Sequence, residues 1–418
     1  MQSPTGDKPS TTTASGPPRT GYRTLLASAD TSFVVLAAAA RLPTAMLPLG
    51  ILLYVADRTG SYGSGGLAVA ALSIGGGIGG PLVGMAADHA GQRIVALGAT
   101  LVQVLGLTAL LVISDSAGLG VVLVAAAAVG LANPQAGAMA RSRWAFMAKG
   151  RTDRGSYTAT AMAWEGAVDE TSFVVGPVLV GTVAGVVSPT VALVLALVLA
   201  ATTQSAFGAH RSALPGRTPA GRLQDEARAP LPLARFTCLL LAMGAVGVVF
   251  GATQTGVAAR MAENGTAGLT GPVYAALGVG SAVAGLLTTR LPAALTLPAR
   301  IALGGALLVL AGLLTAPAQH AALLAAGCLL LGIALGPVLV SCYALAEHLA
   351  PPGWATTTMT ALATSNVVGV AAGAAVAGVL VDQVSPGAAL MVNCAAGVLV
   401  LVSGGLAGIL RETEPART

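Results

Sequence analysis

Long apolar stretches recur along the whole of this 418-residue chain, separated only by short polar segments. A helix needs about 20 such residues to cross the hydrocarbon core of a bilayer. Only 9% of the residues are charged, whereas soluble domains carry about 25%, so the charges are too few to cover a water-facing surface. The 55 glycines and the aromatic content of 4% favour closely packed helices over a β-barrel with aromatic girdles. The sequence therefore predicts an all-α integral membrane protein.

Twelve of these stretches are long enough to span a membrane. They cover residues 31–56, 63–86, 94–114, 118–140, 158–184, 190–209, 236–258, 271–289, 300–316, 321–345, 357–381 and 388–410. Residues 1–28 are rich in Ser, Thr, Pro and Gly and are expected to be a disordered tail, and residues 411–418 form a second tail. The sequence thus predicts a multi-pass protein with twelve transmembrane helices.

The basic residues sort to one side of these spans. With a cytoplasmic N-terminus, eighteen of the 21 Lys and Arg residues fall in inside segments, so the positive-inside rule places both termini in the cytoplasm. The net charge of +5 follows this topology, and we therefore expect no nucleic-acid partner. The excess of Arg, Ala, Gly and Pro over Lys is typical of a high-GC bacterial genome, which indicates a bacterial inner membrane.

The longest polar inside segment, residues 210–235, divides the chain into two halves of six spans, residues 29–209 and 236–410. A shift of 197 places Asp169 on Asn366 and Gly176 on Gly373, which indicates an internal repeat. The shift pairs each span with the sixth span after it, which crosses the membrane in the same direction. The repeat is therefore parallel.

Motifs for enzymatic chemistry are absent from the sequence. It contains no GxxxxGK[ST], HExxH or GxSxG pattern, and its four histidines are scattered. We therefore expect no enzyme, no metal site and no cofactor, and we expect an ion gradient or facilitated diffusion to drive any transport.

The segment that follows the second span carries the most specific motif. It reads Gly84-Met85-Ala86-Ala87-Asp88-His89-Ala90-Gly91-Gln92-Arg93. This resembles the G-x-L-A-D-R-x-G-R-K signature of the major facilitator superfamily, with matches at Gly84, Ala87, Asp88, Gly91 and Arg93 and departures at Ala86, His89 and Gln92. The resemblance implies two parallel-repeat six-helix bundles. It also implies that Asp88 holds the cytoplasmic side shut by pairing with Arg141 or Arg143. The alternative is a turn with one solvated carboxylate.

Charged residues inside spans are costly and rarely left unpaired. At 1.5 Å per residue, Arg41 lies about 14 Å from the inner end of the first span, and Glu165 and Asp169 lie about 10 Å and 17 Å into the fifth. Spans 1 and 5 are neighbours in the resembling fold, which implies that Arg41 pairs with one of these acids. Glu170 points about 100° away from Asp169. Three carboxylates facing one arginine indicate proton coupling, with Asp169 as the first candidate, whereas a purely architectural pair is the alternative.

Polar residues on other spans predict a mildly polar substrate cavity. The candidates are Asn133, Gln135, Gln254, Tyr274, Tyr343 and Asn366. Each could instead form an interhelical hydrogen bond.

The functional hypothesis is a monomeric secondary transporter of a small organic molecule, surrounded by membrane lipid and working by alternating access. Gly176-Pro177 followed by Gly181 resembles part of the Gly-Pro motif of antiporter branches, so we expect proton-coupled export of a drug or metabolite. The alternatives are an uptake permease for a sugar or other metabolite, and a transport-inactive membrane sensor or assembly partner.

Overall fold

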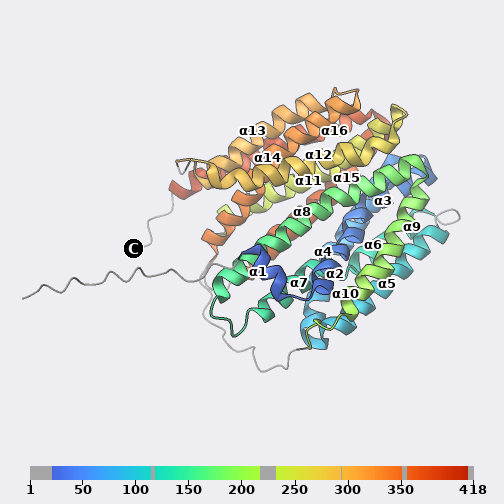
Figure 1. Cartoon of the computed structure of the whole chain (residues 1–418). Helices are drawn as coiled ribbons and strands as arrows, with labels where there is room; N and C mark the ends of the chain where they lie inside the picture. The colour runs from blue at the N-terminus through green and yellow to red at the C-terminus, as the bar shows by residue number, and fades with distance from the viewer. Residues whose placement is uncertain (1–20, 114–117, 217–231, 293, 351–354, 413–418) are drawn as a thin grey trace, which may run out of the picture.

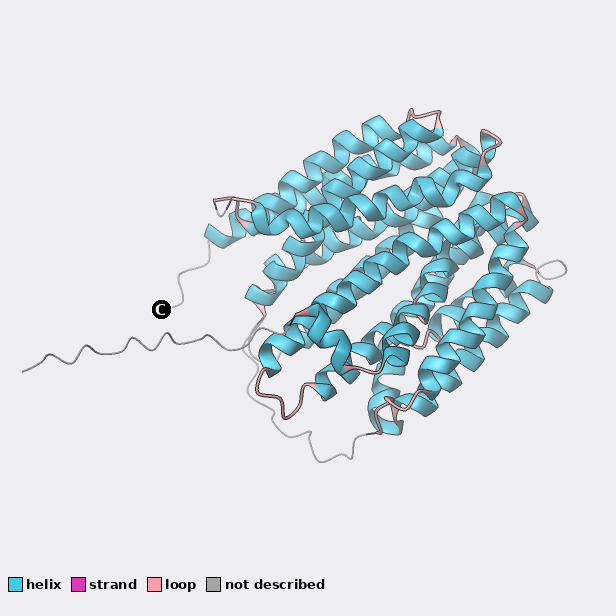
Figure 2. Cartoon of the chain, in the orientation of Figure 1, coloured by secondary structure: helices cyan, strands magenta, loops and turns pink. Residues whose placement is uncertain are grey.

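The protein is a bundle of long helices that run nearly parallel to one another (Figures 1 and 2). The computed structural model describes residues 21–113, 118–216, 232–292, 294–350 and 355–412, and it contains no strand within them. Twelve helical spans in this part of the chain are long and apolar enough to cross a membrane. They coincide with the twelve predicted stretches, which confirms the predicted fold class.

The first half of the chain supplies six of the spans. Its elements are α1 (Tyr22–Ser28), α2 (Thr31–Ala39), α3 (Leu42–Thr59), α4 (Tyr62–Ala90), α5 (Gln92–Ile113), α6 (Leu119–Leu131), α7 (Ala136–Met147), α8 (Arg154–Val186), α9 (Pro189–Leu199), the π-helix η1 (Ala200–Gln204) and α10 (Ser205–Ala209). Spans 1 and 4 are each broken into two helices, α2–α3 and α6–α7, whereas the sequence predicted continuous helices.

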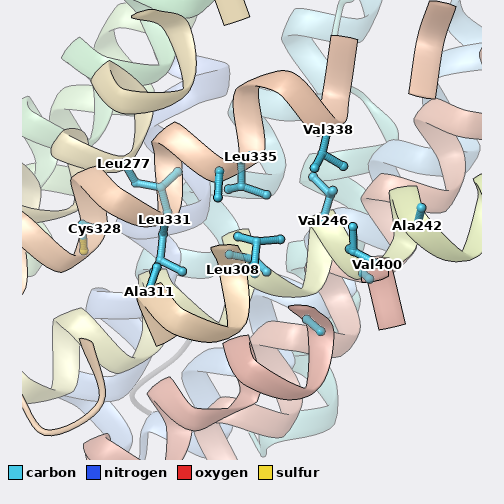
Figure 3. Packing of buried hydrophobic residues seen from close by; sticks show 14 of the residues in the cluster. Ala242, Val246, Leu277, Leu308, Ala311, Cys328, Leu331, Leu335, Val338 and Val400 are labelled. Carbon is cyan, nitrogen blue, oxygen red and sulfur yellow. The ribbon is translucent and has the colours of Figure 1, made fainter. Parts of the chain in front are cut away.

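The second half supplies the other six spans. Its elements are α11 (Leu233–Glu263), the 3₁₀ turn η2 (Ala267–Leu269), α12 (Thr270–Leu287), the 3₁₀ turn η3 (Thr288–Arg290), α13 (Leu297–Thr315), α14 (Ala321–Leu349), α15 (Ala355–Gln383) and α16 (Pro386–Glu412). Leu331 and Leu335 of α14 are fully buried against side chains of α11, α12 and α13 in one apolar cluster (Figure 3).

Two ends of the molecule can be distinguished. The terminal end is where α1 begins and α16 ends, and the far end carries the α3–α4 and α11–α12 connections (Figure 1). Between the halves, α4 packs along α15 and α8 packs along α12. The Gly181 backbone of α8 meets the Gly271 backbone of α12 so closely that a Cβ atom at either position would overlap the other helix. The ribbons of α8 and α12 lie together at the far end and separate toward the terminal end (Figure 1).

Two expectations about the terminal end are wrong. Residues 22–28, predicted as part of a disordered tail, form α1 because Leu25 is fully buried and the Ser28 hydroxyl lies 3.1 Å from that of Tyr157. The rest of the predicted tail, residues 1–20, is outside the described residues. The segment from Ala87 to Ala90, which lies beyond the predicted span 63–86, is the last turn of α4. It remains helical because alanine is a strong helix former, and the chain turns only at Gly91, with φ of 92°.

The positions at both ends allow the predicted orientation to be tested. Thr152 is an exposed turn residue at the terminal end, and Val384 is exposed at the far end beyond α15. Because basic residues concentrate at the terminal end, a membrane-impermeant maleimide should label Thr152→Cys only in permeabilised cells and Val384→Cys in intact cells. The native cysteines, which are buried or half-buried, serve as the background control. Labelling of Thr152→Cys in intact cells would overturn the orientation.

Candidate functional site

The break in span 1 lies beside Arg41 and follows from Pro43. A proline has no N–H to give to the carbonyl four residues earlier, which here belongs to Ala39. The Thr203 hydroxyl shares its proton between that carbonyl, at 3.3 Å, and the Leu199 carbonyl of its own helix, at 2.7 Å. The Gln204 side-chain amide donates to the Ala40 carbonyl at 3.5 Å. Both donors belong to the π-helix η1. Span 6 therefore satisfies the backbone groups that the break exposes, which is necessary inside a membrane.

The break in span 4 has a similar origin. Pro134 separates α6 from α7, and Gln135 adopts the left-handed φ of 55°. The Thr44 hydroxyl donates to Asn133 Oδ1 at 3.2 Å, which joins the break in span 4 to the start of α3. Discontinuous helices of this kind form the binding sites of many transporters, because polar backbone at membrane depth is tolerated where it lines a cavity.

Arg41 is the centre of a charged cluster at these breaks. Its Nη2 atom pairs with Glu165 Oε2, and its Nε atom lies 2.7 Å from Asp169 Oδ1. Its Nη1 atom donates to the Ala37 carbonyl at 2.8 Å. The Nε–H bond is not aligned for a hydrogen bond, so the contact with Asp169 is purely ionic. The predicted pairing of spans 1 and 5 is thus observed for both acids.

A second arginine completes the cluster. Arg141 of α7 pairs through Nη2 with Asp169 Oδ2, so Asp169 lies between two guanidinium groups. Arg41 and Glu165 are 6% and 1% exposed, whereas Asp169 is 27% and Arg141 39% exposed. The cluster therefore has a closed side at Glu165 and an accessible side at Asp169.

Glu165 is held by an aromatic residue as well as by Arg41. The Trp144 indole N–H donates to Glu165 Oε1 at 2.7 Å, so both carboxylate oxygens have partners. Trp144 is fully buried between Phe33 and Tyr157, with ring centroids 5.2 Å and 6.2 Å away. Because this packing fixes the indole, Glu165 is a rigid, fully satisfied member of the cluster.

Gly137 of α7 allows the charged groups to approach one another. A Cβ atom at this position would lie 3.3 Å from Arg41 Nε, 3.4 Å from Asp169 Oδ1 and 3.5 Å from Arg141 Nη1. A longer side chain would therefore have to displace all three groups.

Glu170 lies outside the cluster. It is exposed and forms no ion pair or hydrogen bond with any residue that the structure describes. The two arginines thus contact two carboxylates, Glu165 and Asp169. The third carboxylate, Glu170, is the next residue after Asp169 and has no close counter-ion among the described residues.

The predicted gate at Asp88 is not formed. Arg141 pairs with Asp169, and Arg143 donates from Nε to Gln92 Oε1 at 2.8 Å and from Nη1 to the Ser212 hydroxyl at 2.9 Å. Asp88 is exposed and has no ion pair within the described part of the chain. The expected pairing of Asp88 with either arginine is therefore absent, because both guanidinium groups are engaged elsewhere.

The structure also shows where the other residues of the predicted gate lie. Gly84 lies within α4, Gly91 forms the turn, and Arg93 is exposed in the first turn of α5. Arg143 is 1% exposed, and its guanidinium carbon lies 3.9 Å from the centroid of the Phe207 ring. This arginine therefore joins α7 to α5 and α10.

A carboxylate that the sequence analysis missed joins the halves at the far end. Asp382, in the last turn of α15, accepts hydrogen bonds from the Ser61 hydroxyl at 2.5 Å, from Tyr62 N at 2.9 Å and from Gly63 N at 2.9 Å. These groups form the start of α4, where unpaired N–H groups and the helix dipole favour a negative charge. We call this contact the far-end latch.

The predicted cavity residues divide into two sets. Asn133 and Gln135 lie at the break beside the cluster. Asn366 donates to the Met243 carbonyl at 3.3 Å, so it joins α15 to α11 as an interhelical hydrogen bond. Gln254 is 5% exposed, and Tyr274 and Tyr343 pack against the apolar cluster of the second half. No hydrogen bond links the two sets within the described residues.

A polar contact outside the spans fixes the start of α2. The pKa of Asp30 is lowered to about 2 because its carboxylate accepts hydrogen bonds from Ser32 and Arg211. His210 lies nearby, and partial burial lowers its pKa. These groups tie the chain that leaves span 6 to the beginning of span 1.

Comparisons with known proteins agree with this architecture. The family model of the Major Facilitator Superfamily matches residues 33–374. No curated protein matches the chain.

Solved structures of several transporters have a similar fold. The human organic anion transporter MFSD10 (TETRAN) is 19% identical with a TM-score of 0.61, over 92% of this chain and 99% of that one. A mutant of the nucleoside transporter NupG is 13% identical with a TM-score of 0.70, over 92% and 99% of the two chains. The peptide transporter POT in complex with sulfate is 16% identical with a TM-score of 0.66, over 94% and 96%.

The geometry of the cluster predicts the effect of removing Arg41. Arg41→Met leaves Glu165 buried without its counter-ion, which should lower the free energy of unfolding by about 3–5 kcal/mol. Adding Glu165→Gln should recover much of this loss, since the amide oxygen can still accept from Trp144 and carries no charge. Thermal unfolding in detergent measures both, with Arg154→Met at an exposed position as control. A double variant no more stable than the single one would show that Glu165 is not the charge that Arg41 neutralises.

Proposed function

The chain belongs to the major facilitator superfamily, a family of transporters, and we propose that it exports a small organic molecule across a bacterial inner membrane in exchange for protons. Membership of this family supports secondary transport by alternating access, in which two repeats rock against each other around a site at mid-membrane. The direction of transport, the coupling ion and the substrate class are our proposal.

The charged cluster is the observation that carries the proposal. Asp169 is half-buried at a helix break, in contact with both Arg41 and Arg141, and it is more accessible than Glu165. Ionisable groups at membrane depth are costly and typically mark ion or substrate pathways. Proton binding to Asp169 would release Arg141 without disturbing the pair between Arg41 and Glu165. Arg141, which is 39% exposed, can then meet an anionic group of the substrate, or Glu170 a cationic one.

The contacts between the halves support an inward-facing conformation for this structure. The far-end latch and the close approach of Gly181 to Gly271 hold the two bundles together at the end that we assign to the cell exterior. Asp88, at the opposite end, is exposed and outside any described ion pair. We propose that the latch opens and an Asp88 contact forms when the protein turns outward.

Replacement of Asp169 tests the coupling role. Asp169→Asn keeps the shape and loses the titratable charge, so proton-driven accumulation in proteoliposomes should fall to the passive level. Counterflow exchange without a proton gradient should stay within about threefold of the wild type, because it needs no change in the charge of Asp169 and the amide keeps the shape of the side chain. Asp57→Asn, an exposed carboxylate at the end of α3, is the matched control. Uphill transport by Asp169→Asn would make the cluster architectural and move coupling to Glu170.

Replacement of Asp382 tests the conformational assignment. Asp382→Ala removes three hydrogen bonds between the halves, so outward-facing molecules should become more populated. Spin labels at Val187 and Val384, both exposed at the far end, should then show a longer distance in pulsed electron resonance. Asp57→Ala should leave the distance unchanged, and Asp88→Ala should keep it short while transport falls. An unchanged distance in Asp382→Ala would contradict the latch.

A further inference from the structure

An apolar groove lies on the second half of the molecule, on the surface of α12, α13 and α14. Helices α12 and α13 each pack along α14 but make no extensive contact with each other. The space between them has a volume of about 250 Å³ and is open along one side. Its walls are Ala284 and Leu287 of α12 and Leu303 and Leu307 of α13, and its floor is formed by Ile333, Ala334 and Pro337 of α14.

The groove faces the surroundings of the protein and not its interior. Leu287, Leu303, Leu307 and Ile333 are 41–50% exposed, whereas Leu331 and Leu335 point from α14 into the apolar core (Figure 3). Helix α13 packs on α14 and α16 and makes no extensive contact with the first half of the chain. Because α12 to α14 are membrane spans, the groove opens toward lipid acyl chains and away from the charged cluster.

The mouth of the groove carries positive charge. Arg300 lines it at the terminal end, where its Nε atom donates to the Leu295 carbonyl at 2.9 Å and its Nη2 atom to the Pro292 carbonyl at 3.3 Å. These bonds fix the guanidinium group and leave Nη1 without a hydrogen bond to any described residue. Arg290 is exposed, and in the sequence it stands between Thr288 and Leu291, which both line the groove. None of the described residues that line the groove is acidic.

We propose that this groove binds one anionic phospholipid, with an acyl chain between α12 and α13 and its phosphate at Arg300 and Arg290. An apolar groove between helices accepts an acyl chain by close van der Waals packing, and basic groups at a membrane interface favour anionic headgroups over zwitterionic ones. The positive charge at the mouth of the groove selects an anionic lipid. The groove also holds the acyl chain, which a merely basic surface would not do.

Native mass spectrometry of the purified full chain tests the site. The protein is titrated with phosphatidylglycerol and with phosphatidylcholine of identical acyl chains. The wild type should hold one phosphatidylglycerol more tightly than any phosphatidylcholine. Arg300→Gln should weaken that binding about fivefold, and Arg290→Gln with Arg300→Gln about thirtyfold, to the level of phosphatidylcholine. Arg154→Gln, an exposed arginine at the start of α8, should leave binding unchanged.

A second variant separates the groove from the charges. Ala284→Phe fills the groove with both arginines intact and should abolish the tight binding, while circular dichroism confirms that the helices remain. Equal affinity of the wild type for the two lipids would overturn the proposal. So would tight phosphatidylglycerol binding retained by Ala284→Phe, since the lipid would then be held by surface charge alone. Loss of affinity in Arg154→Gln equal to that in Arg300→Gln would also contradict it.

Discussion

The ion pair between Arg41 and Glu165 is the interaction on which the charged cluster depends. Removing both charges from water costs several kcal/mol per ion, which the pair recovers only with good geometry and further hydrogen bonds to its remaining polar atoms. Trp144 occupies the second oxygen of Glu165, and the Ala37 carbonyl accepts a further N–H from Arg41. The break after Ala39, which follows from Pro43, lies beside this pair, and Thr203 and Gln204 of the π-helix in span 6 donate to the backbone carbonyls at the break.

Asp169 differs from Glu165 in its contacts and in its exposure. Its carboxylate contacts Arg41 without an aligned hydrogen bond, shares Arg141 and remains 27% exposed. A proton that reaches Asp169 would change the charge beside α7 and leave the Arg41–Glu165 pair in place. Because α7 belongs to a broken span that touches α3 through Asn133 and Thr44, such a change can alter the packing of spans 1, 4 and 5 together. In the proposed mechanism, this arrangement links protonation of Asp169 to movement of one bundle.

The sequence was sufficient to predict the twelve spans, because each is an apolar stretch of membrane length. The pairing of Arg41 with Glu165 or Asp169 was predicted from their matching depths together with the family resemblance, which makes spans 1 and 5 neighbours. Pro43 and Pro134 also carried a signal for the helix breaks, although the sequence analysis predicted continuous spans. Other features had no such signal. Trp144 resembles any buried aromatic residue, and Arg141 was assigned to the gate because depth alone does not show which way a side chain points. The latch at Asp382 joins residues more than 300 positions apart, and only the packing of the two halves brings them together. Helix α1 is too short for periodicity to reveal it, and tertiary burial of Leu25 stabilises it instead.

The central claim is that Asp169 takes up a proton while Glu165 stays ionised. Infrared difference spectroscopy of the protein in lipid, between acidic and neutral pH, detects the carbonyl stretch of a protonated carboxylic acid without any knowledge of the substrate. The account predicts that acidification produces such a band in the wild type and in Asp57→Asn. In Asp169→Asn the band should lose the intensity of one carboxyl group, whereas in Glu165→Gln it should keep that intensity. Identical difference spectra for the wild type and Asp169→Asn, or a component lost only in Glu165→Gln, would contradict it.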